Sequence, residues 1–312
     1  SKKDMVIPFY NLSDYNIWRE NNNINGYKIK YYKGLGTSTS TEAKEYFREL
    51  SQNLVEYTHS DNTNSDIELA FKKTLTDERK KWVIDTKKDT LQISKNVTYS
   101  DFIHKDLVWF SIADNIRSIP NIMDGFKPSQ RKVLFACRKR QNSETKVSQL
   151  SGYISTETCY HHGEQSLMTT VINMAQDYVG SNNINLLEPV GQFGTRLMGG
   201  KDAASPRYIF TKLNNITNNI FDKNDDSILE YVEDDGTKVE PVYYVPVLPM
   251  VLVNGCEGIG TGYSTFVPSY NVKDIVENLQ NFIAKKPMKP MTPWFKGIKG
   301  KIVKDTETRY IT

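Results

Sequence analysis

The sequence predicts an α+β fold, and three features of its 312 residues support that class. Apolar residues recur at helical spacing through much of the chain beyond residue 100. Shorter runs rich in Val, Ile, Tyr and Phe, near 207–211 and within 242–253, are typical of strands. The hydrophobic share of 38% and the charged share of 25% are those of an ordinary globular protein.

The first hundred residues mix one expected strand with polar helices. Residues 27–36, "YKIKYYKGLG", predict a strand that ends in a Gly-x-Gly turn. A helix is expected over 37–54, where Thr39 and Glu42 have the spacing of a capping box. Three further segments complete this part: a polar loop at 58–66, a charged helix at 67–84 and a connector at 85–99.

A series of short helices is expected from residue 100 onward. Pro120 closes the first, and Pro128 begins the second at a position where its missing N–H costs little. Two more helices flank the break at 161–163. Because strands follow these short helices and tight turns, the pattern indicates a winged helix-turn-helix.

The last third of the chain contains an acidic segment and an amphipathic helix. Residues 222–236, "DKNDDSILEYVEDDG", predict a solvated loop or hairpin. Apolar residues from Val272 to Phe282 keep helical spacing, and 285–293, "KKPMKPMTP", is typical of an extended linker.

Composition excludes several classes of protein. The formal net charge of +3 is too small to identify a polyanionic partner, so such a partner must be argued from local patches. The three cysteines form no C-x-x-C pair, which favours reduced thiols in an intracellular compartment. No apolar run approaches the roughly 20 residues of a membrane span, and no signal peptide opens the chain.

A basic run and a pair of histidines are candidates for phosphate contact. Seven basic residues against one acid lie between Lys127 and Lys146, as either a solvated helix face or a surface for phosphates. His161 and His162 cannot share one helical face, and no nearby ligand completes a zinc site. A structural turn, phosphate contact and acid–base work all remain open for them.

Two further segments raise the question of nucleotide or phosphate chemistry. "YKGLGTSTS" lacks the G-x-x-x-x-G-K-[ST] pattern, so we reject ATP binding there. In "GGKDAASPRYIF" (199–210), Tyr208 fits a buried strand aromatic, but Arg207 beside it offers a second interpretation. A guanidinium and a metal could stabilise a phenolate nucleophile and a phosphoryl transition state.

Several long stretches together resemble the eukaryotic type IIA DNA topoisomerases. They are "YYKGLGTSTSTEAKEYF", "RSIPNIMDGFKPSQRKVLF", "YHHGEQSLMTTVINMAQDYVGSNNINLLEPVGQFGTRLMGGKDAASPRYIF" and "LPMVLVNGCEGIGTGYST". The resemblance runs through nearly the whole chain and is densest from about 100 to 270. It implies a segment of the DNA-cleavage core, divided into the end of a TOPRIM domain (1–55), a connector (56–99), a winged-helix domain (100–262) and the start of a tower domain (263–312).

The resemblance also implies roles for particular residues. Tyr208 would attack a DNA phosphodiester to form a 5′-phosphotyrosyl link, and Arg207 would stabilise the scissile phosphate. The other implied catalytic residues are His161, His162 and Arg131. The implied DNA contacts are Lys33, Lys127, Lys132, Lys146, Gln192, Arg196 and the wedge residue Ile259, which would help to kink the duplex.

Cofactors and partners follow from the same resemblance. Mg²⁺ would be held by a glutamate and an Asp-x-Asp-x-Asp cluster, which do not occur before Lys33, so no metal ligand is expected in this chain. ATP would serve a domain that this chain lacks. The expected partners are double-stranded DNA and a second copy of the protein, each tyrosine working opposite the other copy's metal site, and the expected location is the nucleus. The chain by itself is expected to be inactive.

Two other functions are compatible with these residues. A winged-helix module could bind DNA while Tyr208 has a structural role only. A metal-dependent nuclease is the third possibility, but the chain lacks a suitable acidic cluster.

Overall fold

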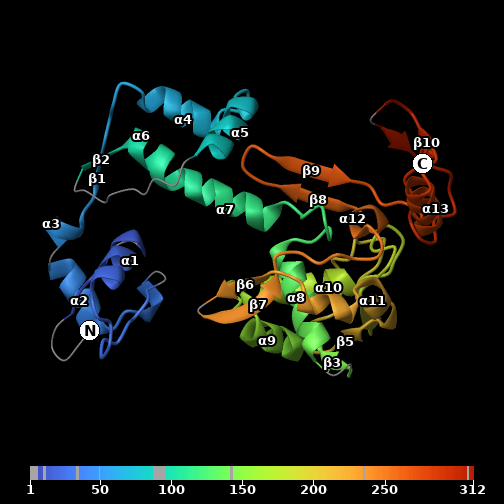
Figure 1. Cartoon of the computed structure of the whole chain (residues 1–312), viewed down its shortest axis with the longest axis horizontal. Coiled ribbons are helices and arrows are strands. Elements are labelled where there is room, and N and C mark those ends of the chain that lie inside the picture. Colours follow the sequence, from blue (N-terminus) through green and yellow to red (C-terminus); the bar gives the residue numbers. More distant parts are fainter. Residues whose placement is uncertain are drawn as a thin grey trace. The chain divides into compact units, whose positions relative to one another are not determined.

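The computed structural model describes residues 6–9, 12–32, 35–48, 50–86, 96–140, 143–234, 236–307 and 309–312. These residues form a mixed helix and sheet structure with two compact units, residues 1–112 and 113–312 (Figure 1). Helix α7 (Val108–Ser118) contains the boundary.

In its described residues, the first unit contains short helices and one pair of parallel strands, β1 and β2. Its elements are α1 (Leu12–Asn21), a 3₁₀ turn (Leu35–Thr37), α2 (Ser40–Arg48), α3 (Leu50–Asn53), β1 (Glu56–Thr58), α4 (Thr63–Phe71), α5 (Thr76–Asp85), β2 (Asn96–Thr98), α6 (Tyr99–Phe102), a π-helical turn (Ile103–Leu107) and α7.

The expected capping box at the start of α2 is confirmed. The backbone N–H of Thr39 donates to Glu42 Oε2 at 2.7 Å, and the N–H of Glu42 donates to Thr39 Oγ1 at 3.3 Å. The expected strand over 27–36 is wrong, because 27–32 pair with no strand among the described residues. Instead, the side chains of Lys30 and Tyr32 both bind the carboxylate of Glu42.

These contacts make the Glu42 carboxylate a sensitive reporter of the local fold. The hydrogen bond from Lys30, followed by the one from the Thr39 backbone, lowers the pKa of Glu42 from 4.5 to about 2. A carboxyl whose pKa is lowered by folding contributes stability above its ordinary pKa and loses that contribution as the pH falls through the lowered one.

We therefore expect the Glu42 carboxyl to titrate near pH 2 when followed by carbon NMR. The structure around the start of α2 should weaken between pH 4.5 and about 2. In the Lys30→Ala variant the midpoint should rise towards the ordinary value, because the largest cause of the shift is gone. A midpoint near 4.5 in the unmodified protein would contradict the observed ion pair.

The charged region at 67–84 forms two helices, α4 and α5, in place of the single expected one. Arg79 of α5 connects the two helices, since its buried side chain contacts the end of α4. It donates to the carbonyl of Leu69 at 2.9 Å and to that of Lys72 at 2.7 Å. These bonds satisfy carbonyls that have no partner within the helix.

The second unit is built around three packed helices and a three-stranded antiparallel sheet of order β3-β5-β4. Its elements are α8 (Pro128–Lys139), β3 (Thr145–Lys146), α9 (Val147–Glu157), α10 (Glu164–Ala175), β4 (Leu187–Val190), β5 (Phe210–Leu213), α11 (Asn215–Ile220), a 3₁₀ turn (Lys223–Ser227), β6 (Tyr231–Asp234), β7 (Thr237–Pro241), α12 (Met250–Val253), β8 (Cys256–Ile259), β9 (Ser264–Val267), α13 (Val272–Ile283), β10 (Val303–Lys304) and β11 (Tyr310–Ile311).

The core of this unit lies between α8, α9, α10 and the sheet. Val133 and Leu134 of α8, Ile154 of α9 and Leu167 and Val171 of α10 have no exposed surface. Each helix therefore presents the apolar face that its sequence spacing predicts.

Most of the expected elements in this unit are present. Pro128 begins α8, two helices flank residues 161–163, and the acidic segment ends in β6, the first strand of the antiparallel hairpin β6–β7. The expected strand over 242–253 is wrong, because the strand β7 ends at Pro241 and α12 begins at Met250. Pro246 and Pro249 explain the difference, since neither has the backbone N–H that a strand interior requires.

Candidate functional site

Tyr208 lies in a tight turn that leads into β5. Its side chain is 69% exposed, whereas the next residue, Ile209, is 1% exposed and anchors the turn in the core. The turn is also fixed to the first residues of α9. The N–H of Ser148 donates to the carbonyl of Pro206 at 3.2 Å, and that of Val147 donates to the carbonyl of Ile209 at 3.0 Å. A rigid backbone therefore presents an exposed phenol, and the alternative of a buried strand aromatic is wrong.

Arg207 contributes a positive charge next to this phenol. Its guanidinium carbon lies 5.3 Å from the centre of the Tyr208 ring, and its Nε donates to Ser205 Oγ at 3.3 Å. Lys146 lies on the neighbouring strand, paired with Phe210, and its Nζ is 5.9 Å from the Phe210 ring centre. The structure thus brings two cationic side chains to the turn that carries Tyr208.

The loop that precedes the turn is held in one conformation by its own side chains. The carboxylate of Asp202 accepts from the N–H and the hydroxyl of Thr195 at 2.8 and 2.7 Å, and the hydroxyl bond is the main reason why the pKa of Asp202 is lowered. Gly194 has φ +101°, and a Cβ there would lie 2.6 Å from the Cα of Gly200. Only glycine fits this close approach.

Gln192 and Arg196 lie in the same loop, and both are exposed. The carbonyl of Gln192 accepts from the N–H of Ala204 at 2.9 Å, and its side chain accepts from Gly194 at 3.1 Å. The side chain of Gln192 therefore has a role in loop geometry in addition to its predicted contact with DNA.

The histidine pair follows a strained backbone position. Cys159 has φ +47°, a left-handed conformation that residues other than glycine adopt at a cost. The exposed His161 ring approaches Asp234 of β6, with Nε2 3.1 Å from Oδ2. The ring of His162 packs edge-on against Tyr160, at 5.5 Å between centres. Both histidines thus lie on the surface, and His161 has a carboxylate partner that can orient it.

Most of the basic run between Lys127 and Lys146 is engaged in ion pairs within the protein. Four of its basic residues bind acids from other segments: Arg131–Asp124, Lys132–Glu240, Arg138–Asp226 and Lys139–Glu157. The charge of the run is therefore less available to a polyanion than the sequence indicates.

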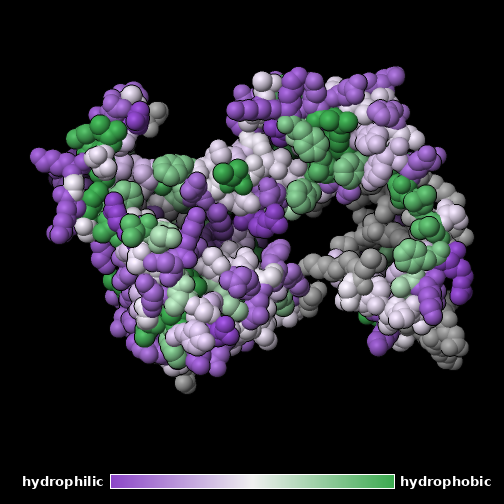
Figure 2. Space-filling model, turned by 180° about the vertical axis from the view of Figure 1, so that it is seen from behind, coloured by the Kyte–Doolittle hydropathy of each residue, from purple (hydrophilic) through white to green (hydrophobic). Residues whose placement is uncertain are grey.

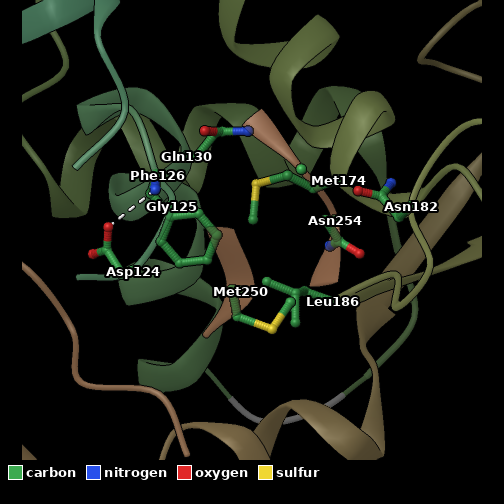
Figure 3. A pocket seen from close by; sticks show the side chains of 10 residues that line it. Asp124, Gly125, Phe126, Gln130, Met174, Asn182, Leu186, Met250 and Asn254 are labelled. Atoms are coloured by element: carbon green, nitrogen blue, oxygen red, sulfur yellow. Dashed lines mark hydrogen bonds between the residues drawn. The ribbon is translucent and has the colours of Figure 1, made fainter. Parts of the chain in front are cut away.

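Arg131 illustrates this most clearly. Its side chain is 6% exposed, and Nε and Nη2 donate to Asp124 at 2.7 and 3.0 Å. Asp124 is fully buried and also accepts from the N–H of Phe126, a bond drawn in Figure 3, and from that of Tyr244. The geometry gives Arg131 a structural role, and its catalytic role stays a prediction.

Lys132 is similarly occupied, since its Nζ lies 2.7 Å from the carbonyl of Thr158 and 2.8 Å from Glu240, both buried. Lys127 caps α8 and is half-buried. Lys33 lies outside the described residues. Of the expected DNA contacts, Lys146, Gln192 and Arg196 thus cluster around the Tyr208 turn and its loop.

Ile259 is at the end of β8, in the hairpin β8–β9. Its side chain is 74% exposed. Gly258 and Gly260 bring the hairpin against the end of α7 and Pro120, where added Cβ atoms would lie 2.3 Å from the Ser118 carbonyl and 2.1 Å from Asn115 Oδ1. The support for Ile259 is therefore rigid.

Two cavities border this region, and both are small. One, of about 80 Å³, is lined by residues such as Phe126, Met174 and Met250 (Figure 3). The other, of about 230 Å³, lies between the start of α8 and β8 and includes Lys127 and Cys256. Both are below the roughly 300 Å³ at which ligand pockets begin.

The described residues do not fit a metal ion such as Mg²⁺. No group of three or more His, Cys, Asp or Glu side chains among them is arranged to hold one. Over the same part of the chain, no helix is both long and apolar enough to cross a membrane.

Sequence reasoning did not identify Asp124, Glu240 or Phe266. Neither acid stands at a spacing from its partner that indicates an ion pair. Asp124 is 7 residues before Arg131, and Glu240 is 108 residues after Lys132. Phe266 could have been found from the alternation of "STFV", which places it on the same strand face as Ser264.

The chain belongs to the family of the DNA gyrase/topoisomerase IV A subunits, whose model matches residues 117–312. A second model, the C-terminal associated domain of TOPRIM, matches residues 1–115. The junction of the two matches is within a few residues of the boundary between the compact units at 112 and 113.

Among individual relatives, DNA topoisomerase 2 of Plasmodium falciparum is 51% identical over 97% of this chain, which covers 22% of that protein. DNA topoisomerase 2 of Saccharomyces cerevisiae is 50% identical over 98% of this chain, which covers 22% of it. The chain thus spans about a fifth of the length of these relatives.

A solved structure, the P. falciparum topoisomerase II DNA-binding, cleavage and re-ligation domain, is 50% identical and matches with a TM-score of 0.80. The match covers 99% of this chain and 43% of that one.

Proposed function

We propose that this chain is part of the DNA-cleavage core of an ATP-dependent type II DNA topoisomerase that cuts and rejoins both strands of a duplex. The observation that carries this proposal is the exposed Tyr208 beside Arg207, on a turn fixed to α9. The similarity to a solved domain named for DNA binding, cleavage and re-ligation supports it.

In the proposed reaction, the Tyr208 hydroxyl attacks a phosphodiester. A bond forms between the tyrosine oxygen and phosphorus, the bond to the 3′-oxygen breaks, and the tyrosine proton is lost while the 3′-oxygen takes one up. Since one ester replaces another, the bond energy is kept and re-ligation needs no separate energy source. Arg207 faces the charge that develops on the phosphate oxygens.

The finer architecture is part of the same proposal. Helices α8 to α10 with the sheet β3-β5-β4 would form the winged-helix domain, preceded by the end of a TOPRIM domain and followed by the start of a tower. A dimer in the nucleus would bring each Tyr208 to the metal site of the other protomer. The Mg²⁺ and ATP sites would belong to parts of the protein outside this chain.

Mapping the covalent product tests the proposal. Full-length protein containing this chain is mixed with Mg²⁺ and a duplex labelled at one 5′ or one 3′ end, then denatured with detergent. We expect the 3′-end label to remain with the protein, because the tyrosine is joined to the 5′ phosphate of the fragment that contains the strand's 3′ end. Mass spectrometry should place the adduct on Tyr208.

Other outcomes would favour the two alternative functions. Free 5′-phosphates without attached protein would indicate a metal-dependent nuclease. Binding of the duplex without any cleavage would indicate a DNA-binding module. An adduct on a different tyrosine would overturn the assignment of Tyr208.

A further inference from the structure

The hairpin β8–β9 carries two large apolar side chains on one outward face. In its antiparallel register Glu257 is opposite Phe266, and Ile259 is opposite Ser264. Because side chains alternate along a strand, these four residues share one face of the hairpin. Ile259 and Phe266 are each 74% exposed, and they are diagonal neighbours, close enough for an aromatic ring to reach.

The opposite face of the hairpin is covered, so this outward face has a fixed direction. Gly258 is buried against the carbonyl of Ser118 and the ring of Pro120. Asn115 Nδ2 donates to the carbonyl of Thr261 at 3.0 Å, which holds the tip of the hairpin. The exposed apolar pair is thus presented by a supported element and not by a loose loop.

Exposure alone does not show that the pair is a binding surface, since hydrophobic residues are visible in several places on the surface seen in Figure 2. The arrangement of the pair is more specific. One pair of large side chains on a narrow, rigid hairpin matches the apolar wedges with which proteins open a base step from the minor groove. A flat protein partner is instead bound by a broader contiguous patch.

The surroundings of the hairpin favour DNA as the occupant of this face. The start of β8 and the N-terminus of α8 share the walls of the 230 Å³ cavity, which places Lys127 next to the base of the hairpin. Glu257 is the single acid among the four outward residues, and it lines the same cavity as Lys127. Lys127 places a cation at the base of the hairpin, where Glu257 and Phe266 are opposite each other, and Ile259 lies nearer the tip. This order suits a phosphate backbone at the base and an opened base step towards the tip.

Resting on the proposed function, we infer that Phe266 is a second wedge residue, which packs against the bent duplex beside Ile259. It holds the kink open by covering the sugar and base edges that the kink exposes. Its contribution is to the bent form of the DNA more than to initial binding, because the kink creates the apolar surface that the ring covers.

Bending of a short duplex, measured by energy transfer between dyes at its two ends, tests this inference in the full-length protein. We expect Phe266→Ala to lower the ratio of bent to straight bound DNA roughly fivefold, the effect of losing one weak aromatic contact to a base. Phe266→Thr keeps a residue suited to a strand and should behave in the same way. Phe282→Ala removes a similarly exposed phenylalanine (68%) in α13 and should leave bending unchanged.

A double-variant comparison separates a shared wedge from two independent contacts. If both side chains hold one kink, Ile259→Ala with Phe266→Ala should cost less than the two single changes combined. Unchanged bending in both Phe266 variants, with folding intact by circular dichroism, would overturn the inference while leaving the proposed function in place. Absence of any DNA binding or bending by the unmodified protein would instead remove the proposed function.

Discussion

Tyr208→Phe is expected to abolish covalent attachment of the protein to DNA while leaving duplex binding nearly unchanged. The substitution removes one hydroxyl from a side chain that is 69% exposed. Folding and the cationic surroundings of the turn should therefore persist. The loss of cleavage should be about a thousandfold or more, as for other enzymes that lose a covalent nucleophile.

The measurement is detergent-trapped covalent complex, with binding measured in parallel by a mobility shift. Tyr31→Phe is a matched control, because Tyr31 is 66% exposed and lies in the other compact unit. Covalent complexes that persist in Tyr208→Phe at the unmodified level would show that another residue is the nucleophile.

Asp124→Ala is expected to produce the largest loss of stability in the second unit. The change leaves the Arg131 guanidinium buried without its counter-charge and removes the acceptor for the N–H groups of Phe126 and Tyr244. Removing one partner from a buried ion pair typically costs about 3–5 kcal/mol. Denaturant unfolding followed by circular dichroism measures the shift in midpoint.

Glu307→Ala provides the contrast, because Glu307 is 93% exposed in its ion pair with Lys304 and such a pair contributes little. The double variant Asp124→Leu with Arg131→Met replaces the buried pair by apolar groups and should recover part of the loss. If Asp124→Ala were as stable as the unmodified protein, the buried ion pair would not be the anchor that the geometry indicates.

The elements that sequence predicted well are those set by nearby residues. Helix α8 begins at Pro128, and the Thr39–Glu42 capping box starts α2, because both signals act within one helical turn. The expected strand at 27–36 is wrong because a strand needs a partner, and none of the described residues supplies one. A local pattern contains no information on whether that partner exists.

The candidate site also contains some features set by nearby residues and others set only by tertiary structure. The local sequence left two interpretations of Tyr208 open, and its exposed position beside Arg207 agrees with the second one. The basic run from Lys127 to Lys146 left open a solvated helix face or a surface for phosphates, whereas Asp124 and Glu240 bind Arg131 and Lys132 in the interior. Such pairings arise from tertiary structure, over as many as 108 residues, and charge counting along the chain does not detect them.

The two backbone hydrogen bonds between the Tyr208 turn and the start of α9 also have a mechanical consequence. If Tyr208 holds a cut DNA strand, any pull on that strand passes through the turn directly into a helix whose inner face is buried in the core. The tyrosine and α9 must then move as one body. Separation of the cut ends would require displacement of the whole helical unit, and a swing of the side chain alone would not achieve it.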